Sequence, residues 1–166
     1  MKLRFFIVLL VVLSPLVALA ATAGTAKGTI TFNSKPKKLV YAYAWKEEDH
    51  FEKGVINTVV LLSDTKLDDA SMADRSSRTE AARAGKFTGV LVNISPKGKI
   101  ESATFYTAVE DGYFDDASGT HRWEKKTLSN SVVEGKLSTP ESHFSKTSYA
   151  YSATFKAPIG PPHKAK

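Results

Sequence analysis

The chain has 166 residues, a formal net charge of +6 at pH 7 and no cysteine. Its length is typical of a single domain. The absence of cysteine excludes disulfides, thiolate metal sites and a cysteine nucleophile. The excess of basic over acidic residues is small and scattered, and the lysines at 35–38 fit a solvated turn, which argues against nucleic acid as a partner.

The first twenty residues have the three-part pattern of a secretory signal peptide. Two basic residues precede an apolar run at 5–13, and small residues at 18–20 suit a signal peptidase. The main alternative is a retained membrane anchor, but a span needs about 20 apolar residues, and this run is broken by the serine and proline at 14–15. We predict a signal peptide at 1–20, with the exact cleavage site open by a few residues. The mature protein is then periplasmic or secreted and has no stable membrane span.

Beyond the expected signal, apolar and polar side chains alternate with a period of two, which predicts β-strands. Turns recur between the strands at the short intervals of antiparallel proteins, so we predict an antiparallel β-sandwich or a flattened barrel. A single β domain is expected at 24–157, followed by a flexible tail rich in proline and lysine at 158–166. About eight strands are expected, at 29–32, 39–45, 55–62, 87–94, 100–109, 120–128, 132–137 and 147–155.

One segment, 69–84, departs from this alternation. Its small residues recur at spacings of three and four, which predicts one short helix laid over a sheet or plugging an open end. Gly85 suits the left-handed position after the end of the helix. Asp74 and Arg78 are expected to form an i, i+4 ion pair on its outer face.

Two strands carry aromatic side chains at alternate positions. Because residues two apart share a face of a strand, each set is expected to lie together. The sets either pack in the core, with the tyrosine hydroxyls bonded, or line a semi-polar cavity for a small apolar ligand. They are Tyr41, Tyr43 and Trp45, which share their face with Leu39, and Tyr149, Tyr151 and Phe155.

The segment 110–116 is acidic and carries two aromatic residues, Tyr113 and Phe114. A calcium site needs several convergent oxygens, but the segment lacks the spacing of an EF-hand loop. An acidic hairpin loop is the plainer interpretation, and its two aromatic residues are candidate contacts for a partner.

The residues most suited to catalysis are Asp115, Asp116, His121 and Glu124. In a strand, His121 and Glu124 are three residues apart and face opposite sides, so they do not converge on one metal or water. We therefore predict no catalytic residue, metal or cofactor. The segment 120–128 reads as an exposed edge strand whose charges alternate with Trp123, which makes Trp123 a further candidate contact.

Four segments resemble uncharacterised exported β-domain proteins of Gram-negative bacteria: LDD at 67–69, AARAGK at 81–86, GVLV at 89–92 and YAYSATFKAP at 149–158. The resemblance concerns structural motifs. It implies a periplasmic or secreted β domain and carries over no catalytic residue.

The sequence thus favours an exported, non-enzymatic binding or interaction domain, acting through an exposed sheet face, an edge strand or a set of loops. The alternatives are a carrier whose β cavity holds a small apolar ligand, and a hydrolase or metal enzyme that uses His121, Glu124 and the nearby aspartates 115 and 116. The partner is accordingly an unknown protein or a small apolar ligand. The candidate binding residues are Tyr41, Tyr43, Trp45, Tyr113, Phe114, Trp123, Tyr149 and Tyr151.

Overall fold

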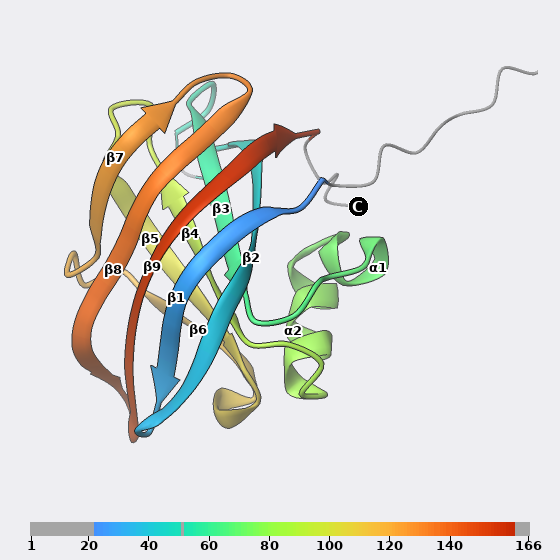
Figure 1. The fold of residues 1–166 in the computed structure, drawn as a ribbon, viewed down its shortest axis with the longest axis vertical. Helices are drawn as coiled ribbons and strands as arrows, with labels where there is room; N and C mark the ends of the chain where they lie inside the picture. Colours follow the sequence, from blue (N-terminus) through green and yellow to red (C-terminus); the bar gives the residue numbers. More distant parts are fainter. Residues whose placement is uncertain (1–21, 51, 162–166) are drawn as a thin grey trace, which may run out of the picture.

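The computed structural model describes residues 22–50 and 52–161. The expected signal peptide at 1–20 and the end of the expected tail, 162–166, lie outside this part of the chain. Figure 1 shows a strongly curved sheet with two short helices packed on one side of it. Within the described residues, no helix has the length and apolar character needed to cross a membrane.

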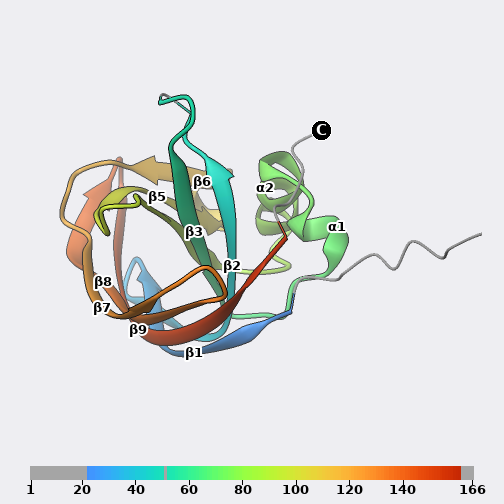
Figure 2. The ribbon, with the colours of Figure 1, turned by 90° about the horizontal axis from the view of Figure 1, so that it is seen from above.

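Nine strands form one sheet in the order β6-β5-β4-β3-β2-β1-β9-β8-β7, and neighbours in this order are antiparallel. The mostly β architecture is therefore confirmed. The sheet curls around one interior and is not closed, because its end strands β6 and β7 do not pair with each other (Figure 2). The strands are β1 (Gly24–Phe32), β2 (Lys35–Glu48), β3 (Ile56–Ser63), β4 (Gly89–Ile94), β5 (Ile100–Thr107), β6 (Gly112–Asp116), β7 (Arg122–Leu128), β8 (Val132–Phe144) and β9 (Thr147–Gly160).

The strand that the sequence did not predict is β6, which occupies most of the expected acidic loop. A short 3-10 helix, η1 (Ala108–Glu110), ends at Asp111, whose positive φ of 49° turns the chain back along β5. Side chains of β6 then alternate: Phe114 and Asp116 are buried, whereas Tyr113 and Asp115 are exposed. The interpretation of the whole segment as a loop is wrong because the reversal is completed at its first two residues, Glu110 and Asp111, and the remainder pairs with β5.

The last strand runs further than expected. In β9, Pro158 pairs with Val132 of β8, and Ile159 pairs in parallel with Ala44 of β2. Residues 158–160 therefore belong to the sheet, and the predicted tail does not begin at 158.

Two helices replace the single one expected: α1 (Asp69–Met72) and α2 (Arg75–Arg83). The break lies at Asp74, whose extended backbone and side-chain acceptance from Ser77 N start a second helix. Arg78 does not form an outer-face pair with Asp74. It is 6% exposed and donates to the Tyr106 hydroxyl and the Met72 carbonyl. Gly85 has the predicted left-handed conformation, with φ of 70°.

The apolar side chains form two clusters, one on each side of the sheet. The inner cluster fills the curl and takes residues from all strands except β7, with Trp123 of β7 packed against it. The outer cluster lies between the helices and the strands β2 to β5, and includes Trp45, Met72 and Phe87. The helices therefore cover one outer region of the sheet (Figures 1 and 2).

The two aromatic sets lie on opposite faces of the sheet, and a β-bulge in the pairing of β1 with β2 accompanies this arrangement. The pairing of β1 with β2 shifts between Thr25 and Gly28, and a bulge interrupts the alternation of side chains. Leu39 consequently lies in the inner cluster, whereas Tyr43 and Trp45 lie in the outer one. The expectation that Leu39 shares their face is wrong. Since Tyr149 and Tyr151 belong to the inner cluster, the two sets do not line one cavity.

Candidate functional site

The open side of the sheet is bridged by side chains rather than by strand pairing. Phe114 of β6 stacks on Phe144 of β8, with ring centroids 4.6 Å apart and planes at 12°. Asp116 of β6 accepts a hydrogen bond of 2.5 Å from the Tyr149 hydroxyl of β9. We call this bridge, which also includes His121, the seam. The seam explains how the sheet keeps its interior closed to water although its two end strands do not pair with each other.

His121 and Asp116 meet inside the seam. Their side chains are 2% and 8% exposed, and His121 Nε2 lies 3.1 Å from Asp116 Oδ2. The two groups are close enough for an ion pair, but they are not aligned as a hydrogen bond. His121 Nδ1 lies 3.3 Å from the Tyr151 hydroxyl, and the Ser118 N–H donates to Asp116 Oδ1 at 2.7 Å.

Burial and hydrogen bonding set the charges of the seam. Burial lowers the pKa of His121 and outweighs the attraction of Asp116, which raises it. Burial also opposes ionisation of Asp116, but hydrogen bonds from Tyr149 and Ser118 outweigh it and hold the pKa of Asp116 below its usual value. Burial raises the pKa of Tyr149, and the hydrogen bond to Asp116 adds to this effect. The seam therefore holds a buried carboxylate beside a neutral imidazole at neutral pH.

The other residues considered for catalysis lie elsewhere. Glu124 points away from the seam and pairs with Lys136 at 2.9 Å. Asp115 faces α2, where it pairs with Arg75 at 2.6 Å. No group of three or more histidine, aspartate or glutamate side chains within 22–50 and 52–161 is arranged to hold a metal ion.

The candidate binding residues are divided among three environments. Tyr43 and Trp45 are 2% and 1% exposed beneath the helices, with Tyr41 partly buried beside them. Phe114, Tyr149 and Tyr151 are buried in the interior. Phe114 is therefore no loop-tip contact.

Only Tyr113 of these candidates is well exposed, at 39%, and its ring lies 4.5 Å from the Arg75 guanidinium carbon. Trp123 is on an end strand, as expected for an edge, but its side chain turns inward. A β-carbon at Gly135 would lie 2.6 Å from Trp123 Nε1, so the glycine makes room for the indole against the inner cluster.

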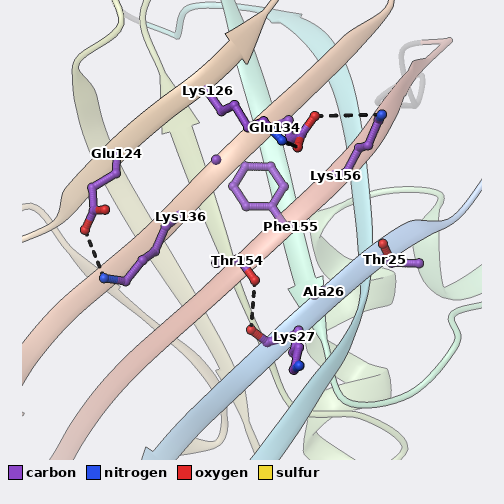
Figure 3. A pocket seen from close by; sticks show the side chains of 11 residues that line it. Thr25, Ala26, Lys27, Glu124, Lys126, Glu134, Lys136, Thr154, Phe155 and Lys156 are labelled. Carbon is purple, nitrogen blue, oxygen red and sulfur yellow. Dashed lines mark hydrogen bonds and ion pairs between the residues drawn. The ribbon is translucent and has the colours of Figure 1, made fainter.

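The outer face of β7, β8, β9 and β1 carries a shallow groove of about 650 Å³ that no helix covers. Figure 3 shows its side chains, with Glu124 paired to Lys136, and Glu134 between Lys126 and Lys156. We call it the lysine groove. It is lined by Thr25, Ala26, Lys27, Glu124, Lys126, Glu134, Gly135, Lys136, Thr154, Phe155 and Lys156.

Strand register arranges these side chains in two rows across the four strands. The first row runs through Glu124, Lys136, Thr154 and Lys27, which are successive cross-strand partners. The second row runs through Lys126, Glu134, Lys156 and Thr25; Lys126 lies at a bulge and donates to Glu134. Each strand thus contributes one lysine, alternately to one row and the other.

The two halves of the lysine groove differ in charge. On β7 and β8 each lysine has a glutamate partner, because Lys136 pairs with Glu124 and Lys126 with Glu134. On β9 and β1 threonines occupy the equivalent positions. Lys156 reaches only the already paired Glu134, at 3.8 Å, and Lys27 forms no ion pair with any described residue. The β9–β1 half is therefore positively charged and rich in hydroxyl groups.

Sequence reasoning missed this groove. Its lysines come from strands far apart in the chain, and only the register of the sheet places them in adjacent rows. A usable signal was present in the alternation of β1 and β9, whose exposed positions at 25–31 and 152–156 are threonine, serine and lysine. That pattern indicates a face with no apolar cover, but not which strands are neighbours.

Fold and surface together define the class of protein: a curled, open antiparallel sheet with a buried polar seam and a charged outer groove. No family model, curated protein or solved structure matches the chain. The similarity to exported Gram-negative proteins therefore stays a prediction from the sequence.

Proposed function

We propose that the mature chain is an exported, non-enzymatic interaction domain that binds its partner at the lysine groove. The observation that carries the proposal is the contrast between the two outer regions of the sheet. Helices cover one of them, whereas the other holds a groove of about 650 Å³ lined by charged and hydroxyl side chains from four strands. Export is supported by the signal-peptide pattern at 1–20.

A non-enzymatic role is supported by the burial of the only histidine and aspartate pair considered for catalysis. A general acid or base must come within hydrogen-bond reach of its substrate, directly or through one water. His121 and Asp116 have side chains that are 2% and 8% exposed, and aromatic rings of the inner cluster surround them. A substrate would have to open the seam to reach them.

The carrier alternative has less support. Phe105 lies at the centre of the interior, with ring centroids of Tyr149 at 4.6 Å, Phe114 at 4.8 Å and Phe32 at 6.1 Å. These are the separations of aromatic rings in direct contact. Core packing thus accounts for the inward-facing tyrosines and phenylalanines without a ligand.

Because the chain has no cysteine, a single introduced thiol can report on each surface. We expect Thr154→Cys, in the groove, to react more slowly with a maleimide when the extracytoplasmic fraction of the source cells is added. The exposed Ser76→Cys on α2 is the control and should react at an unchanged rate. Equal rates for Thr154→Cys with and without the fraction would contradict the proposal.

A further inference from the structure

Building on the proposed function, we infer that the lysine groove binds an acidic polysaccharide, which lies across β7, β8, β9 and β1 with its carboxylates toward Lys27 and Lys156. The inference names the class of partner for the same surface. It follows from the charge pattern, from the chemistry of the lining side chains and from the spacing of the strands.

The charge pattern leaves room for anionic groups in one half of the groove only. Glu124 and Glu134 already neutralise lysines on β7 and β8. At the equivalent positions of β9 and β1, Thr154 and Thr25 leave Lys156 and Lys27 without an acidic partner of their own. A carboxylate placed between these two lysines would complete the alternation of charge that the protein itself supplies on β7 and β8.

The lining side chains favour a hydroxylated ligand over a protein or a membrane. Protein interfaces are anchored by buried tryptophan, tyrosine and arginine, and the groove presents none of these. Its one aromatic residue, Phe155, is 4% exposed. Membrane-surface binding uses an apolar face inserted beside the charges, whereas the exposed large apolar residues, Val40 and Ile56 among them, lie outside the groove. Lysine and threonine can both bond to sugar hydroxyls and carboxylates.

The spacing of the strands suits a polymer rather than an isolated ion. Neighbouring strands lie about 4.8 Å apart, and residues two apart along a strand are about 7 Å apart. Lys27 of β1 and Lys156 of β9 lie on adjacent strands, one in each row, so their α-carbons are separated by roughly 8 Å. A chain with regularly repeated carboxylates can therefore contact both lysines at once, and the two weak contacts add up to a higher affinity.

The probe that we choose is polygalacturonate, a polymer of uronic acid, added to the mature protein at low salt. We expect saturable binding by titration calorimetry that weakens as salt is added, since exposed charge pairs are screened. Neutral dextran should not bind. Polygalacturonate that binds no better than dextran would overturn the inference.

Charge reversal locates the binding site. The double variant K27E/K156E should bind polygalacturonate about tenfold more weakly, a loss of roughly 1.4 kcal/mol. The matched control K97E/K99E makes the same change of net charge at exposed positions in the turn between β4 and β5. Far-UV circular dichroism confirms that both variants are folded. Equal weakening by both double variants would show attraction by net charge alone and would also overturn the inference.

Two further probes distinguish the classes of partner. Poly-L-glutamate that binds as tightly as polygalacturonate would make the partner an acidic peptide, and preferred binding to phosphatidylglycerol vesicles would make it a membrane surface. Either result contradicts the polysaccharide. If no probe binds but Thr154→Cys is still protected in the extracytoplasmic fraction, the groove remains a binding surface and only the class of partner is wrong. If that protection is also absent, the proposed function fails as well.

Discussion

The outer face of the sheet is organised differently in its two halves. On β3 and β4 nearly every residue is buried, because the interior lies on one side and the helices on the other. On β9, buried and more accessible residues alternate almost along the whole strand. One half is therefore a three-layer structure, and the other is a single curved layer with one side in water.

This difference separates the residues that maintain the fold from those that are free to bind. The covered half holds its helices with buried aromatic rings and a buried arginine, so substitutions there act on stability. The bare half, formed by β7, β8, β9 and β1, holds exposed charged side chains that contribute little to stability, so substitutions there should act on binding.

The largest expected effect is loss of the ring beneath the helices. Trp45 is 1% exposed, and the Arg78 guanidinium lies 5.5 Å from its ring. Trp45→Ala should lower the free energy of unfolding by about 3–5 kcal/mol, because it removes a buried aromatic side chain and leaves a cavity. Urea denaturation measures this change. Thr29→Ala, on the exposed face of β1, is the control and should change stability by less than about 0.5 kcal/mol. Similar losses for both would contradict the contrast between the halves.

A smaller effect is expected where the helix meets the sheet through a hydrogen bond. The Tyr106 hydroxyl is buried and accepts from Arg78 Nε at 3.1 Å. Tyr106→Phe leaves that buried donor unsatisfied, which should cost about 1–3 kcal/mol. Tyr113→Phe is the matched control, since its ring is 39% exposed and keeps its contact with Arg75. We expect it to be nearly neutral in the same denaturation experiment. An unchanged free energy of unfolding in Tyr106→Phe would mean that the hydrogen bond from Arg78 does not stabilise the packing of α2 on β5.

The sequence predicted the class of fold because alternation is a local property. Thr147 to Phe155 reads as a half-buried strand wherever it lies in the sheet. The start of the helical region and the glycine at its end were also readable, since caps depend on a few adjacent residues. The break at Asp74 was less visible, because an aspartate inside a run of small residues fits either a helix interior or a new cap.

The candidate site was not predictable in the same way. Leu39 and Tyr43 of β2 face opposite sides where the pairing of β1 with β2 shifts register, and such a shift leaves no distinct mark in a sequence. The sequence singled out both His121 and Asp116, but their contact depends on the conformation of the segment 117–121 that links β6 to β7. Lys27 and Lys156 are neighbours through strand register, which depends on how the whole sheet is assembled.

The seam connects β6 to β8 and β9, and a lower pH should weaken it. Burial lowers the pKa of His121 below its ordinary value of 6.5, so the unfolded chain binds this proton more readily than the folded one. The stability that depends on neutral His121 is therefore present above pH 6.5 and is lost as the pH falls from 6.5 through the lower pKa of the folded state. The hydrogen-bonded Asp116, whose pKa is lowered from 3.8, adds a second loss below pH 3.8.

Two measurements test this dependence on pH. The imidazole signals of His121 should titrate below pH 6.5 in NMR spectra of the folded protein. His121→Gln should flatten the fall in unfolding free energy just below pH 6.5. Tyr149→Phe removes a hydrogen bond that lowers the pKa of Asp116 in the folded state, so the loss of stability below pH 3.8 should become smaller. A His121 that titrates above 6.5 would show that attraction to Asp116 exceeds the effect of burial.

The smallest effect on stability is expected from the ion pairs of the lysine groove. Glu124 and Lys136 have side chains that are 68% and 40% exposed, and exposed pairs contribute only about 0.2–1 kcal/mol. A double-mutant cycle with Glu124→Gln and Lys136→Met should give a coupling energy in that range, falling further as salt is added. A coupling energy in this range would mean that the pair has little part in holding the fold together. A coupling of several kcal/mol would instead make the groove part of the structural framework, and the division between the covered and the bare half would not hold.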